Sequence, residues 1–186
     1  MNALIFVGSG RLDSHTRALG EAIEGSLQSH GATTTLFELA KIGLPMVNPA
    51  FHRDPSQNPD LNVRQLVKLA TEAELFVFLS PIYHNSYSGI LKNALDHLAI
   101  AQFADKVVGL GSHGGNRATQ AVDQLRIVAR GLNAIAIPTQ VCTQDSDFIS
   151  NDTALVLNDE NIKKRVERFT TELVKVGSAL RKDINL

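Results

Sequence analysis

Short apolar runs alternate with longer segments of helical periodicity along this chain, and this alternation constrains its fold more than any other feature. Several of the runs contain no polar residue at alternate positions, which is typical of strands buried on both faces of a parallel sheet. The five expected strands are Ala3 to Val7, Thr33 to Leu39, Leu75 to Leu79, Val107 to Leu110 and Ala134 to Ile137. The alternation predicts an α/β fold.

Helices are expected between and after these strands, at about residues 14–30, 60–73, 88–101, 116–131 and 159–181. The last segment repeats apolar residues at spacings of four and three, which fits a helix face on a sheet better than a coiled-coil seam because fewer than four heptads are present. Residues 40–59 contain four prolines and form one long irregular stretch. Long loops in compact domains are often functional, so we expect this one to border the site.

Composition excludes several classes of function. The 186 residues carry 18 basic and 19 acidic side chains, a net charge of -1, so no overall field attracts nucleic acid or a membrane surface. The single cysteine, Cys142, cannot form an intramolecular disulfide, and the N-terminus lacks a basic region followed by a long apolar segment. We therefore expect one cytoplasmic domain over residues 1–186, with a substantial core and a small ligand.

The segment after the first expected strand has the composition of a phosphate-binding loop. It leads into a helix whose first turn leaves backbone N–H groups unpaired and carries a positive partial charge. Hydroxyls and one guanidinium add donors for phosphate oxygens. The candidate phosphate ligands are Ser9, Arg11, Ser14 and Thr16. An ordinary turn in which Ser14 caps the helix is the alternative interpretation.

Residue types separate three phosphate-binding designs for this loop. A Walker loop is absent, since no Gly-Lys followed by Ser or Thr occurs in the chain. A dinucleotide fingerprint requires a third small residue where Asp13 stands, although Glu38, at the end of the second apolar run, is placed to hold a ribose. A flavin mononucleotide loop, in which hydroxyls and N–H groups surround one terminal phosphate, fits these residues best.

Two later loops have the properties needed to hold a flat heteroaromatic ring. They follow the third and fourth expected strands, so they lie at the same edge of a parallel sheet as the first loop. They offer apolar surface, amides and hydroxyls, and glycines that turn N–H groups toward a negatively charged reduced flavin. The candidates are Pro81, Ile82, Tyr83, His84, Asn85, Ser86, Ser112, His113, Gly114 and Gly115. Plain turns made by the proline and glycines are the alternative.

Together these motifs resemble the NAD(P)H-dependent FMN reductase family of flavodoxin-like proteins. The pattern is Gly8-Ser9-x-Arg11-x-x-Ser14-x-Thr16, then Ser80-Pro81-Ile82-Tyr83-x-x-Ser86-x-x-Gly89-x-Leu91-Lys92-Asn93-Ala94-Leu95-Asp96, then Gly114-Gly115. It covers roughly the first 140 residues, and its long middle block is the most specific part. The resemblance implies a three-layer sandwich with a five-stranded parallel sheet in the order 2-1-3-4-5, FMN as cofactor, and NADPH or NADH as reductant.

The resemblance also implies an activity: a hydride passes from NAD(P)H to FMN and then to a small acceptor such as free flavin, a quinone, an azo compound or a metal oxyanion. By position, the first loop holds the phosphate, and the two later loops line the ring and ribityl chain. No side-chain acid or base is expected, because the cofactor carries the reactive atom. An electron-carrier flavodoxin or a non-catalytic FMN-binding module is the alternative, but the nearly neutral charge disfavours a carrier, which is steered by an acidic face.

Expected partners follow from the same resemblance. The helix over residues 88–101 serves self-association in the resembling family, so a homodimer or homotetramer is expected, although packing on the sheet explains its periodicity equally well. Lys92 and Asp96 are four residues apart and are expected to pair on that helix or across an interface. Tyr87-Ser88-Gly89 resembles the reductases that supply flavin-dependent monooxygenases, a candidate partner. No metal site is expected.

Overall fold

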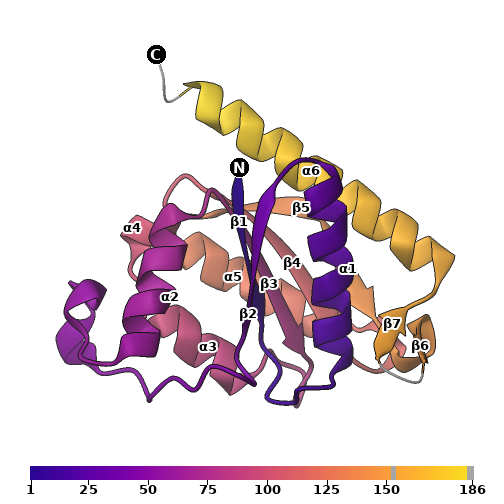
Figure 1. Cartoon of the computed structure of the whole chain (residues 1–186), viewed down its shortest axis with the longest axis horizontal. Coiled ribbons are helices and arrows are strands. Elements are labelled where there is room, and N and C mark those ends of the chain that lie inside the picture. Colours follow the sequence, from indigo (N-terminus) through magenta and orange to yellow (C-terminus); the bar gives the residue numbers. More distant parts are fainter. Residues whose placement is uncertain (152–153, 184–186) are drawn as a thin grey trace.

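A five-stranded parallel sheet in the order β2-β1-β3-β4-β5 forms the centre of the computed structural model, which describes residues 1–151 and 154–183 (Figure 1). Its strands are β1 (Asn2–Val7), β2 (Thr33–Glu38), β3 (Leu75–Pro81), β4 (Val107–His113) and β5 (Ile135–Thr143). Every residue of the central strand β3 is buried, as the apolar sequence of this segment predicts for a sheet covered on both faces. The expected fold class and strand order are confirmed.

Helices cover both faces of this sheet (Figure 1). On one face, α1 (His15–Ser29) and α6 (Glu160–Asp183) pack on the strands; α2 (Leu61–Glu72), α3 (Gly89–Asp96), α4 (Ile100–Phe103) and α5 (Gln120–Gly131) lie on the other. Alternate residues of β1 feed the two cores: Leu4 and Phe6 contribute to the α2/α3/α5 side, and Ile5 to the α1/α6 side. The sheet is therefore the middle layer of three.

The expected last helix is α6, and it packs on the sheet. A Cβ at Gly109 of β4 would lie 2.2 Å from Cζ of Phe169, so the glycine is what lets that ring rest on the strand. Ile162, Val166 and Leu173, which share the spacing of four and three residues, are buried beside it. The preference for a helix on a sheet over a coiled-coil seam was right.

Two expected helices differ from the structure. The segment 88–101 is divided into α3 and α4, and the Lys92 Nζ atom lies 2.6 Å from Asp96 Oδ1 within α3, so this pair forms on the helix. The segment expected to be helical from residue 116 begins with the 3-10 turn η3 (Gly115–Arg117), and α5 starts only at Gln120. Asn116 and Arg117 have φ of 59° and 52°, which is incompatible with an α-helix.

The strands after residue 106 also extend further than their apolar runs. Ser112 and His113 of β4 pair with Cys142 and Thr143 of β5, so polar residues expected in a loop belong to the sheet. Beyond β5 come the 3-10 turn η4 (Asp145–Asp147) and an unexpected hairpin of β6 (Phe148–Ser150) and β7 (Leu155–Leu157). Residues 40–59 are irregular as expected, apart from the short turns η1 (Pro49–Phe51) and η2 (Pro55–Gln57).

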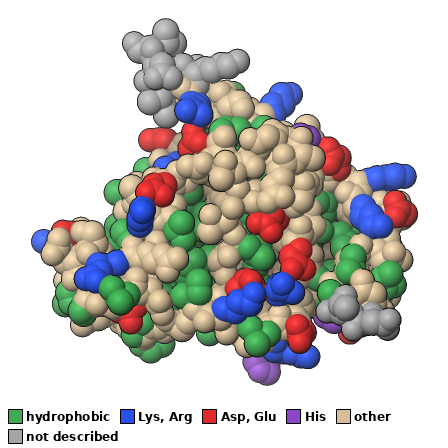
Figure 2. Space-filling view, viewed as in Figure 1, with side chains coloured by type: hydrophobic (Ala, Val, Ile, Leu, Met, Phe, Trp, Pro, Cys, Tyr) green, Lys and Arg blue, Asp and Glu red, His purple; other side chains and the backbone are tan. Residues whose placement is uncertain are grey.

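The surface matches the balanced charge of the sequence. On the face seen in Figure 2, basic and acidic side chains are intermixed, with no broad area of one sign. None of the helices in the described residues is both long enough and apolar enough to span a bilayer.

Candidate cofactor site

Three loops meet at the carboxyl edge of the sheet, after β1, β3 and β4. The Ser88 hydroxyl donates a 2.5 Å hydrogen bond to the carbonyl oxygen of Gly8, which joins the first loop to the second. The Ile82 N–H donates to the carbonyl oxygen of His113 at 2.8 Å, which joins the second to the third. The His113 ring stacks on the His15 ring, with centroids 4.2 Å apart, which joins the third loop to the start of α1 after the first loop. The sequence-based expectation that these loops converge is confirmed.

The first loop presents hydroxyls and N–H groups at the start of α1. Ser9 is buried, and its hydroxyl oxygen accepts the Arg11 N–H at 3.2 Å. Ser14 is the N-cap of α1 and accepts the Arg17 N–H at 3.1 Å, so its side chain does cap the helix. Thr16 is buried in the first turn, and within residues 1–151 and 154–183 its N–H has no hydrogen-bond acceptor. The loop therefore keeps a backbone donor available, as an anion site requires.

The two arginines near this loop have different surroundings. Arg17 is held by Glu38 at 2.9 Å and by Glu21 at 2.6 Å. Glu38 is nearly buried and also forms an ion pair with Lys41 at 2.6 Å. Its carboxylate oxygens are therefore occupied by ion pairs, which disfavours the alternative that Glu38 holds a ribose. Arg11 is exposed, and its guanidinium forms no ion pair with any residue that the structure describes. An unpaired guanidinium beside a helix N-terminus is suited to an anionic ligand.

The second loop contains a tight turn at its tip. Tyr83 and Ser86 exchange backbone hydrogen bonds of 2.9 and 3.0 Å, and the two residues between them, His84 and Asn85, have φ of 48° and 61°. Positive φ at both central positions is the pattern of a type I′ turn. From α5, Gln124 accepts the Ser86 hydroxyl at 2.6 Å and donates to the Asn85 carbonyl at 2.7 Å. Sequence reasoning missed this clamp, because nothing local marks Gln124.

The remaining expected site residues divide into supporting and exposed positions. Pro81 ends β3 and Ser112 lies in β4; both are buried, and Ser112 donates to the carbonyl oxygen of Ala118 at 3.1 Å. A Cβ at Gly114 would lie 2.9 Å from the Ile82 Cβ, so this glycine allows the second and third loops to touch. The Cβ of a residue replacing Gly115 would meet nothing within 4 Å, so this position faces open space.

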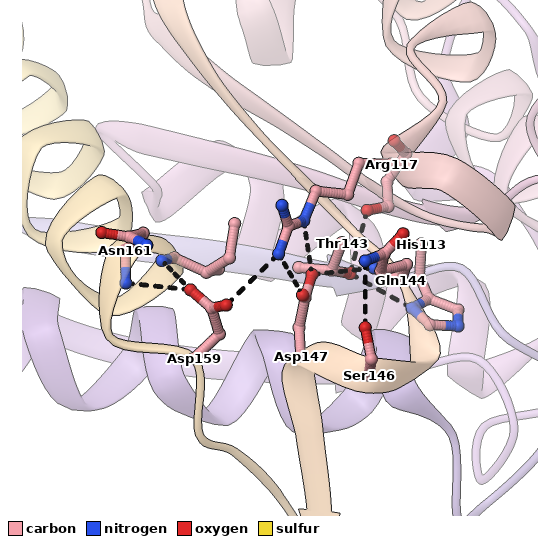
Figure 3. A network of polar contacts seen from close by, with 10 residues as sticks. His113, Arg117, Thr143, Gln144, Ser146, Asp147, Asp159 and Asn161 are labelled. Atoms are coloured by element: carbon pink, nitrogen blue, oxygen red, sulfur yellow. Dashed lines mark hydrogen bonds and ion pairs between the residues drawn. The ribbon is translucent and has the colours of Figure 1, made fainter.

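A network of charged residues fixes the chain just after the third loop (Figure 3). Arg117 Nε donates to Asp147 Oδ2 at 3.0 Å, its Nη2 binds the other Asp147 oxygen, and Nη2 also lies 3.3 Å from Asp159 Oδ2. Burial by itself raises the pKa of Asp147, but the hydrogen bonds from Arg117 and from the Gln144 N–H outweigh it and hold this pKa below its usual value. The network ties η3 to η4 and to the start of α6.

The surroundings of His113 shift the pKa of its ring. Burial lowers its pKa first, and the neighbouring His15 lowers it further, while Asp145 acts in the opposite direction. The net effect is a pKa below the usual histidine value, so the neutral ring predominates at neutral pH.

Comparison with known sequences gives a consistent result. A family model described as NADPH-dependent FMN reductase matches residues 1–147. The FMN-dependent NADPH-azoreductase of Staphylococcus saprophyticus is 38% identical over 176 residues, which cover 94% of this chain and 94% of that protein. The enzyme of the same name from Staphylococcus aureus strain USA300 is 37% identical with the same coverage.

Solved structures share the fold at low sequence identity. The flavoenzyme NAD(P)H:(acceptor) oxidoreductase FerB from Paracoccus denitrificans has a TM-score of 0.72 and 19% identity, over 94% of this chain and 97% of that one. The apo form of the NADH:FMN oxidoreductase EMOB has a TM-score of 0.70 and 20% identity, over 91% and 88%. A flavodoxin from the domain Archaea has a TM-score of 0.64 and 12% identity, over 96% and 99%.

Proposed function

The chain belongs to the NADPH-dependent FMN reductase family, and we propose that it is an FMN-dependent reductase that transfers electrons from NADPH to azo compounds. Membership of the family makes it a flavin oxidoreductase that uses FMN and a nicotinamide reductant. The azo acceptor is carried by one observation, the 38% identity to an FMN-dependent NADPH-azoreductase over 94% of both chains. The even coverage means that the acceptor-binding loops of the two proteins are compared along with the scaffold.

The residues at the edge of the sheet fit FMN. The Arg11 guanidinium and the Thr16 N–H, both without a partner among the described residues, form a donor set for a terminal phosphate together with the hydroxyls of the first loop. The second and third loops provide the exposed aromatic side chain of Tyr83 and open space at Gly115. We assign the phosphate to Ser9, Arg11, Ser14 and Thr16, and the border of the ring to Ile82, Tyr83, His84, Asn85, Ser86, His113, Gly114 and Gly115.

FMN, when bound, supplies the hydride chemistry, and the chain supplies orientation and electrostatics. The turn from Tyr83 to Ser86 is held by its own backbone hydrogen bonds and by Gln124, so it forms a rigid wall for a planar ligand. The Tyr83 side chain is 49% exposed and offers an aromatic surface for stacking. In the third loop the Gly114 N–H donates to the Thr143 carbonyl oxygen at 3.0 Å, so the backbone there is fixed before a ligand binds.

Steady-state assays with the FMN-loaded chain, NADPH and a soluble azo dye test this proposal. Cleavage of an azo bond to two amines takes four electrons, so two molecules of NADPH are consumed for each molecule of dye that is decolourised. Loss of dye at this ratio, dependent on added FMN, supports the proposal. Reduction of quinones or of excess free flavin without loss of dye would overturn the azo assignment; rapid release of reduced flavin would instead fit supply to a flavin-dependent monooxygenase.

We also propose that the chain self-associates through the surface around α3 and α4. Ile90 and Ile100 are 39% and 48% exposed there, and Met46 of the neighbouring loop is 80% exposed. Exposed apolar side chains on adjacent segments are typical of an interface between subunits. Sedimentation equilibrium should give the mass of a dimer or tetramer for the unmodified chain and a smaller mass for Ile90→Glu, whereas equal masses would contradict this surface.

A further inference from the structure

Two imidazoles and one carboxylate converge beside the start of α1. They come from three elements: His15 is the first residue of α1, His113 the last of β4, and Asp145 the first of η4. His113 Nε2 lies 3.1 Å from Asp145 Oδ1, and His15 Nε2 lies 3.9 Å from the same oxygen. One potential ligand atom of each residue lies within 4.8 Å of the other two. No local sequence motif predicts this cluster, because its members are separated by 98 and 32 positions in the chain.

His113 has a polar neighbour at each of its two ring nitrogens. The Thr143 hydroxyl donates its only hydrogen to the carbonyl oxygen of Ser112 at 3.2 Å. The same hydroxyl lies 3.1 Å from His113 Nδ1, so it accepts a hydrogen bond from a protonated Nδ1. In that tautomer the Nε2 lone pair faces Asp145 Oδ1 at 3.1 Å, so the two atoms are placed to bind one shared ion.

Ring packing differs between the members of the cluster. The two imidazole planes are 2° from parallel, and the Phe148 ring packs edge-on against both, with centroid distances of 4.9 Å to His15 and 5.7 Å to His113. The His113 side chain is only 13% exposed, whereas the side chains of His15 and Asp145 are 31% and 87% exposed and have room to move. The cluster therefore has one enclosed nitrogen ligand and two ligands that can turn toward a shared ion.

We propose that His15, His113 and Asp145 form a binding site for a divalent transition metal ion of the zinc class. Imidazole nitrogens with a carboxylate are donors that zinc, cobalt and nickel prefer, whereas magnesium and calcium favour oxygen donors alone. Tetrahedral ligands at about 2.0–2.2 Å from zinc lie roughly 3.3 Å from one another. The observed 3.1 and 3.9 Å separations approach this value. Because each lone pair lies in the plane of its own ring and the two planes are parallel, the more exposed His15 ring must turn out of the stack to share an ion with His113.

The surrounding structure has the features of a metal centre. The Nδ1 contact to Thr143 is an outer hydrogen bond of the kind that orients metal-binding histidines. Three protein ligands leave one of the four tetrahedral positions of a zinc ion unfilled. Because the Asp145 side chain is exposed, water can reach that position. A metal bound here would join the first turn of α1, next to the phosphate loop, to the end of β4. The inference stands on these contacts alone and does not depend on the proposed azo reductase activity.

Isothermal titration of zinc chloride into the FMN-saturated chain, in a buffer free of phosphate and chelators, tests the proposal. We expect saturable binding of one zinc ion per chain, after subtraction of the heat measured with FMN alone. Cobalt(II) should give the visible absorption bands of a tetrahedral nitrogen and oxygen site, which the hydrated ion lacks. Asp145→Asn, at an exposed position, should weaken zinc binding at least tenfold without affecting folding, and His15→Gln should do the same.

His52→Gln is the matched control, because His52 is an exposed histidine in the loop of residues 40–59, outside the cluster. Its zinc affinity should equal that of the unmodified chain. The proposal is overturned if Asp145→Asn and His15→Gln bind zinc as the unmodified chain does, if His52→Gln loses as much affinity, or if only the spectrum of hydrated cobalt is seen. Because these readouts need no turnover, failure of the azo assay would leave the result unchanged.

Discussion

Gly8 and Leu79 touch backbone to backbone: the Gly8 N–H donates to the Leu79 carbonyl oxygen at 2.8 Å, and a Cβ at Gly8 would lie 2.6 Å from that oxygen. The first loop can follow this path only with glycine. Gly8→Ala should therefore lower the free energy of unfolding by about 1–3 kcal/mol, because the loop must move off the strand. Urea denaturation followed by far-UV circular dichroism measures this change.

Gly25→Ala is the control for that substitution. Gly25 lies within α1, and an added Cβ there would meet nothing within 4 Å. Alanine is the better helix former, so this variant should be more stable than the unmodified chain by about 0.5–1 kcal/mol. A Gly8→Ala protein as stable as the unmodified chain would show that the contact with Leu79 does not restrict the loop.

Ser88 connects the first two loops and should contribute to the stability of the folded chain. Its hydroxyl donates to the Gly8 carbonyl oxygen at 2.5 Å and caps α3 by accepting the Leu91 N–H at 3.3 Å. Ser88→Ala should cost about 1–3 kcal/mol of unfolding free energy, because a buried carbonyl loses its donor and the helix loses its cap. Ser56→Ala, at an exposed position, should change stability by less than about 0.5 kcal/mol. Equal stabilities of the two variants would argue against this role.

Arg11 should contribute to cofactor affinity and little to stability. Since its guanidinium has no ion-pair partner among the described residues, Arg11→Ala should unfold at the same urea concentration as the unmodified chain. FMN affinity, measured by quenching of flavin fluorescence, should fall about tenfold or more, which is about 1.4 kcal/mol and within the range for a charged hydrogen bond. Arg53→Ala, another exposed arginine, should bind FMN normally. Unchanged affinity for Arg11→Ala would remove this residue from the phosphate site.

Cys142 should make stability decrease at high pH. Burial raises the pKa of its thiol above the usual value of 9.0, so the folded chain retains the proton at a pH where the unfolded chain loses it. The contribution is therefore complete below pH 9.0 and is lost as the pH rises toward the folded-state pKa. Urea titrations from pH 7 to 10 should show a smaller decrease for Cys142→Ala. Iodoacetamide should also label the folded thiol far more slowly than the unfolded one, and equal rates would contradict its protection.

Sequence patterns predicted the elements whose signals are local. The apolar runs within β1 and β3 are continuous, because a parallel strand buried on both faces needs apolar residues throughout. The phosphate loop and the middle block of the family pattern were recognised for a similar reason: a glycine at a close contact and a serine at a helix N-cap have fixed positions relative to their neighbours. Fold class and the meeting of three loops followed from these signals, and the strand order followed from the family resemblance.

The boundaries of β4, β5 and α5 were not predictable in the same way. Polar residues such as Ser112 and Thr143 join the sheet because each finds a partner on the neighbouring strand, and no local rule records that partner. α5 begins later than expected because Asn116 and Arg117 have positive φ. Arg117 also forms ion pairs with Asp147 and Asp159, which lie far from it in the sequence.

By itself, then, the sequence determined the layered α/β architecture and the N-cap at Ser14 in the first loop, since periodicity and capping act over a few residues. Only the tertiary structure decided that Gln124 clamps the second loop and that His15, His113 and Asp145 share one corner of the molecule. Such contacts join residues that are far apart in the chain, and their geometry exists only after the sheet has brought its strand ends together.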